Sequence, residues 1–165
     1  MEDNLRGEAA KRGIDPARLI FAAHMPHGDH LARLRQADLF LDCFTCNAHA
    51  TASDALWAGV PVLTAPGRSF TARVGASVAQ AIGLPELIAA SRDDYERIAL
   101  ELATDRARLT EIKSQLAHNR NVMPLFDSER FTLHMETAFE IAWDRQQNGL
   151  DPDHIEVPAL PKKHG

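Results

Sequence analysis

Short apolar runs alternate with helical patterns along the first half of the chain. Each run has four or five apolar residues, which is typical of strands buried on both faces of a parallel sheet. The pattern predicts strands at residues 19–23 (LIFAA), 39–43 (LFLDC) and 61–65 (PVLTA). It predicts helices at residues 4–12, 30–37, 51–59 and 71–81, with Gly13 and Gly59 at stop positions. Strands that alternate with helices indicate βαβ units and an α/β fold with a parallel sheet.

The second half has a different pattern. Residues 92–119 and 128–147 read as long helices with charged outer faces. The last helix carries an apolar face at spacings of three and four residues, formed by Phe131, Met135, Ala138, Phe139 and Ala142. We expect this face, and the side chains of Trp57 and Trp143, to pack in the core. Residues 151–165 are rich in proline and polar residues, which predicts a flexible tail.

The composition and charge are those of an ordinary globular protein and argue against several other classes of protein. The chain has 165 residues, of which 45% are apolar and 25% charged, as in ordinary globular domains. A net charge of -5 gives no reason to expect a nucleic acid or an anionic membrane as partner. No apolar run approaches the roughly 20 residues of a membrane-spanning helix. The N-terminus shows no export signal and the chain has two cysteines, so we expect a cytoplasmic protein.

Residues 43–61 (CFTCNAHATASDALWAGVP) allow a metal or redox interpretation. Cys43, Cys46 and His49 have suitable spacing for metal ligands, and a fourth could come from His24, His27 or His30. However, the chain has no second CxxC pair, and the expected helix begins well after the cysteines, unlike a thioredoxin motif. We favour two buried thiols without a metal.

The same stretch also allows a phosphate-binding interpretation. A strand, a polar turn and a helix would place the open amides of a helix start at the carboxyl edge of the sheet, where they attract phosphate. His49 and Thr51 would add side-chain donors, and Asp54 could accept hydrogen bonds from sugar hydroxyls. An equally good interpretation from these residues alone is structural: Asn47 or Thr51 caps the helix and Asp54 complements its dipole.

Three stretches carry a resemblance to a known family: RLIFAAHMPHGDHLARLRQADLFLD, NAHATASDALWAGVPVLTAPG and SFTARVGAS. Together they resemble the C-terminal part of the protein O-GlcNAc transferase and SPINDLY-like glycosyltransferases. The similarity runs from about Leu5 to Pro152. Its most specific motifs are D-x-L-W-A-G-x-P, which begins at Asp54 and follows N-x-H-x-T, and H-x-x-R at His30 and Arg33.

The resemblance implies a GT-B fold, in which two Rossmann-like domains face each other. Residues 1–150 would be part of the C-terminal, donor-binding domain with extra C-terminal helices, and residues 151–165 a flexible tail. By position, His30 would stack on the uracil ring and Arg33 would contact the base. The residues His49, Ala50 and Thr51 would hold the diphosphate, which decides between the metal and phosphate interpretations in favour of phosphate. Asp54 would hold the ribose hydroxyls.

Some positions depart from the family pattern. His27 stands where the family often has lysine, so we regard it only as a possible donor contact. Ala48 and Ala50 replace a frequent glycine and a threonine, which removes one hydroxyl donor. Arg73 matches a recurring family position, although a helix-surface role fits it equally well.

The resemblance implies inverting transfer of GlcNAc or a related sugar from a nucleotide diphosphate to Ser or Thr hydroxyls of an acceptor protein. We expect UDP-GlcNAc or a related donor such as GDP-fucose, and no metal cofactor. The family's N-terminal catalytic half and TPR array are not recognisable here. We therefore expect a fragment that needs those parts for activity, exposes part of helix 128–147, and contains no assignable general base. The alternatives are a non-catalytic nucleotide-binding or interaction module and a Cys/His metal protein.

Overall fold

The computed structural model describes residues 1–159. The chain divides into two compact units, Met1–His30 and a second that begins at Leu31, and each is described by itself. The division lies inside helix α2 (His27–Leu34). Residues 160–165 of the expected tail lie outside the described residues.

The first unit contains helix α1 (Glu2–Lys11) and the short 3-10 helix η1 (Pro16–Arg18). Gly13 follows α1 with a φ of 73°, which confirms the predicted stop. Residues 19–23 form neither helix nor strand, and Ile20 is 89% exposed, so the predicted first strand is wrong. A strand needs a neighbour that accepts and donates its backbone hydrogen bonds, and an apolar run alone does not supply one.

A small parallel sheet forms the centre of the second unit. Strands β1 (Phe40–Leu41) and β2 (Val62–Leu63) pair in parallel, with Phe40 opposite Val62. An isolated parallel bridge between Thr64 and Ile88 extends the sheet by one more segment. The α/β class and the strands near residues 40 and 62 are therefore confirmed, although both strands are shorter than predicted.

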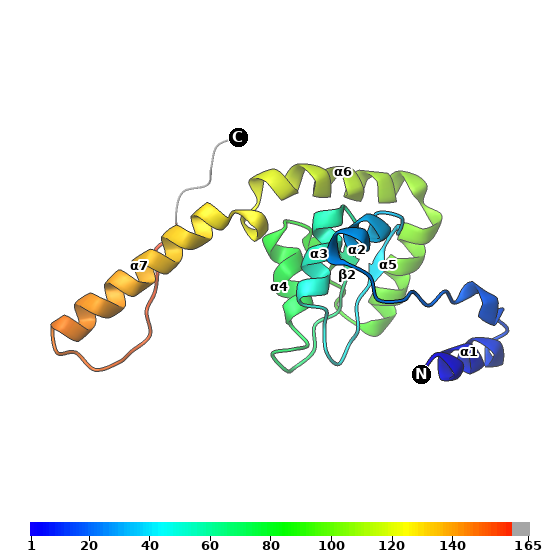
Figure 1. The fold of residues 1–165 in the computed structure, drawn as a ribbon, viewed down its shortest axis with the longest axis horizontal. Helices are drawn as coiled ribbons and strands as arrows, with labels where there is room; N and C mark the ends of the chain where they lie inside the picture. Colours follow the sequence, from blue (N-terminus) through cyan, green and yellow to red (C-terminus); the bar gives the residue numbers. More distant parts are fainter. Residues whose placement is uncertain (160–165) are drawn as a thin grey trace. The chain divides into compact units, whose positions relative to one another are not determined.

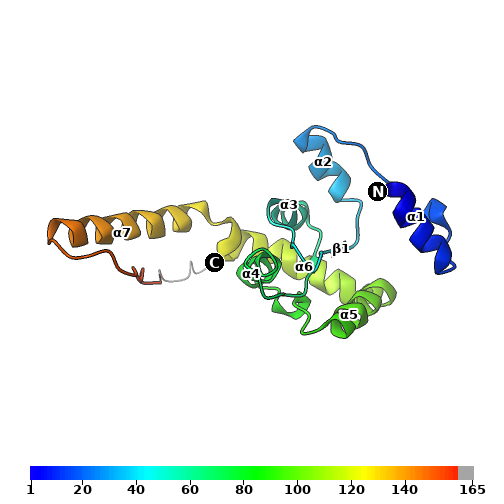
Figure 2. The same ribbon diagram turned by 90° about the horizontal axis from the view of Figure 1, so that it is seen from below.

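Helices pack around these strands, as Figures 1 and 2 show for α3, α4, α5 and α6. The bounds are α3 Ala50–Ala58, α4 Val74–Ala81, η2 Pro85–Leu87, α5 Arg92–Thr104, α6 Arg106–Val122, η3 Pro124–Phe126 and α7 Ser128–Gln147. The long helical stretch predicted at residues 92–119 consists of two helices, α5 and α6. The chain breaks at Asp105, whose carboxylate accepts a 3.0 Å hydrogen bond from the Arg108 amide and caps α6.

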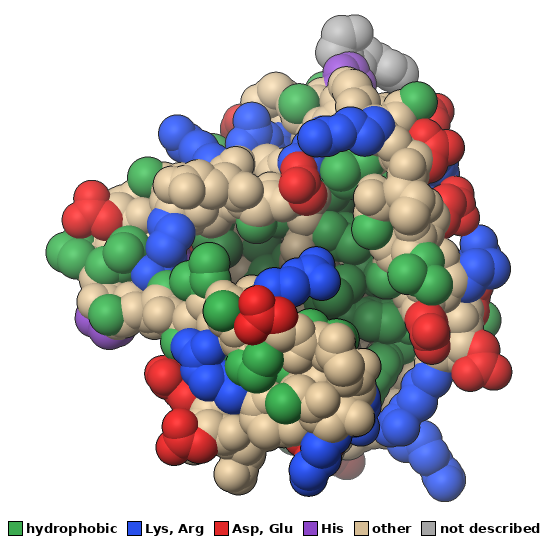
Figure 3. Space-filling model, turned by 90° about the vertical axis from the view of Figure 1, so that its right-hand side faces the viewer, with side chains coloured by type: hydrophobic (Ala, Val, Ile, Leu, Met, Phe, Trp, Pro, Cys, Tyr) green, Lys and Arg blue, Asp and Glu red, His purple; other side chains and the backbone are tan. Residues whose placement is uncertain are grey.

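The core lies between the sheet and helices α3 to α6. Its fully buried side chains are mainly aliphatic and include Leu56, Leu63, Ile82, Leu84, Leu87, Ile112 and Leu116. Helix α3 ends at Gly59, whose φ of 90° confirms the predicted left-handed stop. On the face shown in Figure 3, charged side chains of both signs are interspersed, with hydrophobic side chains between them.

The two tryptophan side chains are not in the core. Trp57 is 51% exposed and Trp143 is 63% exposed, so their predicted burial is wrong. Helix α7 confirms the predicted element, but it has no buried residue: its apolar face is open, with Phe131 and Phe139 each 65% exposed. This exposure agrees with the expectation that part of helix 128–147 would be uncovered. Within residues 1–159, none of the helices combines the length and hydropathy that a membrane crossing requires.

Candidate functional site

Two loops meet at the carboxyl end of the sheet. Because β1 and β2 are parallel, the segments that follow them leave from the same edge. One segment, residues 42–49, leads into α3, and the other, residues 65–73, leads into α4. Figure 1 shows the two loops projecting side by side, and the Asn47 amide donates a 2.9 Å hydrogen bond to the Thr71 carbonyl between them.

The start of α3 has open backbone donors. His49 is the N-cap residue and its carbonyl accepts from the amides of Ala52 and Ser53, at 3.1 and 3.2 Å. The amides of Ala50 and Thr51 find no acceptor in the described part of the chain. No side chain caps this helix, so the interpretation in which Asn47 or Thr51 acts as the cap is wrong. Open amides and the helix dipole together favour an anion at this position.

A buried carboxylate braces the turn before α3. Asp42 is 5% exposed, and its Oδ1 accepts from the amides of Cys43 (2.8 Å) and Ala48 (2.7 Å). Its Oδ2 accepts a 2.7 Å hydrogen bond from the hydroxyl of Thr64, which is fully buried on the neighbouring segment. These charge-assisted hydrogen bonds fix both ends of the turn to the sheet.

Asn47 joins the same turn to α4. Its side-chain amide donates to the Cys43 carbonyl at 2.7 Å, and its Oδ1 accepts from the Gly75 amide at 3.2 Å. A Cβ on Gly75 would lie 2.5 Å from Thr64 Oγ1, which is too close for an unstrained contact. Glycine at this position therefore allows α4 to approach the Asp42–Thr64 pair.

Helix α5 supports the turn from another side. The Tyr95 hydroxyl donates a 3.0 Å hydrogen bond to the Asp42 carbonyl, and its ring packs edge-on against Phe44 at 5.0 Å. The guanidinium of Arg92 lies 4.9 Å from the centre of the Phe44 ring. Burial raises the pKa of Tyr95 to about 12, with smaller contributions from the negative charges of Asp42 and Cys43. Tyr95 is thus a neutral donor at ordinary pH.

His49 leans toward the loop after β2. Its Nε2 lies 3.4 Å from the Thr71 carbonyl oxygen, and its ring lies 6.3 Å from the Phe70 ring at an angle of 90°. A carbonyl oxygen only accepts hydrogen bonds, so this contact fits a proton on Nε2. The contact places the imidazole at the helix start rather than over the core.

Most of the predicted site residues belong to the second unit, and two belong to the first. His49, Ala50, Thr51 and Asp54 lie at the start and second turn of α3, and Arg33 lies in the same unit on α2. His27 and His30 lie in the part of α2 that belongs to the first unit, so only their place along that helix is described.

Sequence reasoning missed the supporting residues Asp42, Asn47, Gly75 and Tyr95. For Asp42 a signal was present, because a carboxylate at the end of an apolar run needs polar partners once it is buried. For Tyr95 we find no signal in the sequence.

The cysteines do not form a buried pair. Cys43 and Cys46 are free thiols and both are exposed, so the predicted burial is wrong. The turn directs its polar backbone groups toward Asp42 and leaves both thiols outside. In residues 1–159, no three His, Cys, Asp or Glu side chains gather in a way that could hold a metal ion. The metal alternative therefore has no ligand cluster in this part of the chain.

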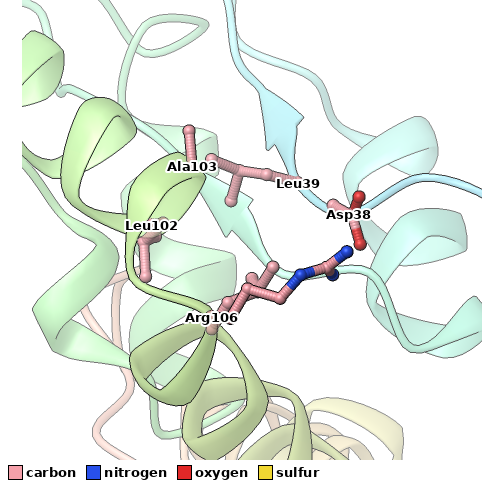
Figure 4. Close-up of a pocket in the computed structure, with 6 residues that line it drawn as sticks. Asp38, Leu39, Leu102, Ala103 and Arg106 are labelled. Atoms are coloured by element: carbon pink, nitrogen blue, oxygen red, sulfur yellow. The ribbon is translucent and has the colours of Figure 1, made fainter.

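A separate pocket of about 290 Å³ lies at the other end of β1. Figure 4 shows the Arg106 side chain directed toward Asp38, with Leu39 and Leu102 beside them. The Asp38 carboxylate is paired with Lys113 at 2.9 Å, which lowers its pKa. Ligands of open α/β sheets bind at the carboxyl ends of the strands, so this pocket is not the candidate site.

Comparisons with known proteins place the chain in a family. The sequence profile of glycosyl transferase family 41 matches residues 1–135. The chain is 36% identical over 154 residues to a UDP-N-acetylglucosamine--peptide N-acetylglucosaminyltransferase of Caenorhabditis elegans, covering 93% of this chain and 13% of the relative. It is 34% identical over 157 residues to the probable enzyme SEC of Arabidopsis thaliana, covering 94% and 16%.

A solved structure agrees with these matches. The fold superposes on a Thermobaculum terrenum O-GlcNAc transferase mutant with a TM-score of 0.81 and 30% identity, over 90% of this chain and 29% of that chain. The chain thus spans less than a third of the relatives it matches. With a profile match over most of its length and the same fold as a family member, the chain belongs to glycosyl transferase family 41.

Proposed function

We propose that this chain is the donor-binding portion of a protein O-glycosyltransferase that transfers GlcNAc from UDP-GlcNAc to Ser or Thr hydroxyls. The observation that carries the proposal is the open start of α3, where the Ala50 and Thr51 amides have no acceptor among the described residues and follow a turn braced by buried Asp42. The names of the family relatives, which specify UDP-N-acetylglucosamine and a peptide acceptor, support the choice of substrates.

In this proposal the diphosphate lies at the start of α3. The amides of Ala50 and Thr51 donate to its oxygens, and the Thr51 hydroxyl and His49 imidazole add side-chain contacts. Asp54, one turn further along α3, accepts from the ribose hydroxyls. Arg33 and His30 contact the base, and His27 is a possible further contact. The family resemblance and the relatives' names support the choice of uracil as the base.

The reaction needs a place for the charge of the leaving group. The acceptor oxygen attacks the anomeric carbon, the bond from that carbon to the phosphate oxygen breaks, and negative charge grows on the diphosphate. Preorganised amides directed at this charge contribute about 3–4 kcal/mol per key donor in well-studied enzymes. This stabilisation requires no metal ion. We assign no base for the acceptor proton within this chain and expect it in the remaining length of the longer enzyme.

Calorimetric titration with UDP tests the proposal. Thr51→Val removes one hydroxyl donor and Asp54→Asn removes the carboxylate charge, so each should weaken UDP binding by about 1–3 kcal/mol. Thr132→Val and Asp144→Asn are matched controls, because both residues lie on α7, away from the start of α3. The controls should bind UDP like the unchanged chain.

Three outcomes would contradict the proposal. If Thr51→Val and Asp54→Asn bind UDP as well as the controls do, the site assignment is wrong. If the purified protein carries stoichiometric zinc that is lost on Cys46→Ser, the metal alternative replaces it. UDP binding without any transfer by the longer protein would favour a non-catalytic nucleotide-binding module.

A further inference from the structure

One aromatic side chain beside the start of α3 has no role in the core. Phe70 is 72% exposed, although it lies within a loop that contacts the candidate site. Its ring stands perpendicular to the His49 imidazole, with 6.3 Å between the ring centres. Single exposed phenyl rings are common on protein surfaces. What distinguishes this one is its position beside His49, where it can contact a ligand bound at the start of α3.

The loop fixes the position of Phe70. The Gly67 amide donates to the Ala72 carbonyl at 2.7 Å, and the Arg73 amide donates to the Phe70 carbonyl at 3.0 Å. The Arg73 guanidinium also donates to the Arg68 carbonyl at 2.8 Å. These hydrogen bonds close residues 67–73 into a compact turn, so the phenyl ring projects from a structured base.

The same loop is tied to the turn before α3. The Asn47 amide donates to the Thr71 carbonyl at 2.9 Å, and the other side of that turn is anchored by Asp42. These hydrogen bonds keep the loop that carries Phe70 next to His49 and to the open amides at the start of α3. Asp54, one turn further along α3, and Phe70, on the loop beside His49, mark two directions that lead away from those amides.

The order of groups in a nucleotide sugar decides between these directions. In the proposed function the nucleoside lies toward Asp54 and the diphosphate lies at Ala50 and Thr51. The hexose follows the diphosphate on the side away from the nucleoside. His49 links the helix start to the loop of Phe70, so the hexose comes to lie beside this loop.

We propose that Phe70 is the platform on which the donor hexose stacks, and that it makes the site favour a nucleotide sugar over the bare nucleotide. A pyranose ring presents axial C–H groups on one face, and these groups pack well on the electron-rich face of a phenyl ring. The ligand class at this subsite is a hexose joined to a nucleoside diphosphate. The inference rests on the proposed function.

The test compares two ligands on one set of variants. UDP and UDP-GlcNAc are titrated separately into the 165-residue chain by calorimetry. Phe70→Ala should weaken UDP-GlcNAc binding by about tenfold and leave UDP binding within about twofold. Phe70→Tyr keeps the ring and should restore UDP-GlcNAc binding. Phe139→Ala is the matched control, because Phe139 is also a highly exposed phenylalanine but lies on α7.

Each outcome decides the proposal. Loss confined to UDP-GlcNAc in Phe70→Ala, with rescue by Phe70→Tyr, supports the sugar platform. Equal loss for both ligands, or no loss for either, overturns it, while UDP binding by the unchanged chain still supports the proposed function. If the unchanged chain binds neither ligand, the proposed function and this inference fail together. Circular dichroism of each variant confirms that the fold is unchanged.

Discussion

Replacing Thr64 with valine tests whether the buried network supports the turn before α3. The two side chains have nearly the same shape, so Thr64→Val leaves no cavity. It removes one hydrogen bond, from Thr64 Oγ1 to Asp42 Oδ2 at 2.7 Å. Thr64 is fully buried and Asp42 is 5% exposed, so water cannot easily replace the lost donor.

The expected loss follows from the charge on the acceptor. A hydrogen bond to a charged group contributes about 1.5–3 kcal/mol. Valine has no hydroxyl, so the residue at position 64 would no longer donate to the buried Oδ2 of Asp42. The free energy of unfolding should therefore fall by about 2–3 kcal/mol. The Asp42 Oδ1 contacts with Cys43 and Ala48 remain, so the turn should loosen without unfolding.

Urea denaturation followed by circular dichroism at the helix band measures this loss. Thr110→Val is the matched control, because the Thr110 hydroxyl bonds only to the Arg106 carbonyl on an exposed part of α6. The control should change the free energy of unfolding by less than about 0.5 kcal/mol. If Thr64→Val and Thr110→Val are equally stable, the Asp42–Thr64 contact does not stabilise the turn and the reasoning is refuted.

Two further predictions concern other parts of the second unit. Tyr95 is the only tyrosine in the chain, so absorbance at 295 nm reports its ionisation alone. Its pKa is raised to about 12, so stability should be unaffected below pH 10 and decline as the pH rises from about 10 to 12. At pH 11 the folded chain should show about a tenth of the tyrosinate signal and the urea-unfolded chain about nine tenths; equal signals with native circular dichroism would contradict this. The open apolar face of α7 should promote self-association, and a double Phe131→Ser, Phe139→Ser variant should sediment with less dependence on concentration. A wild-type chain that stays monomeric at every concentration reached would contradict the second prediction.

Local sequence patterns located the elements of the second unit well. The Gly59 stop, the strands near residues 40 and 62, and the helix after residue 128 all follow from short-range signals, because a left-handed glycine or an amphipathic period acts within a few residues. The motif from Asp54 to Pro61 is equally local, and it is one of the specific motifs that carry the family resemblance. For the same reason the break at Asp105 was recognisable in principle as a capping residue.

Burial depended on neighbours that the sequence does not specify. An apolar run at residues 19–23 and an amphipathic face on α7 both carry the signature of packed elements, yet neither contains a buried residue. Trp57 likewise lies at the surface, where its ring meets Phe126 at 5.1 Å. The sequence shows that a side chain can be buried, whereas only the arrangement of other elements decides whether it is.

The candidate site also has one part that the sequence indicated and another that only the structure revealed. The sequence by itself located the polar turn and the start of α3, because a polar turn between a strand and a small-residue helix is a local pattern. Only the tertiary structure revealed the supports of that turn, which come from residues 64, 75 and 95 and reach Asp42 or Asn47 across the fold. Hydrogen bonds between such distant positions depend on how the sheet and helices pack, and no short-range rule of the chain encodes them.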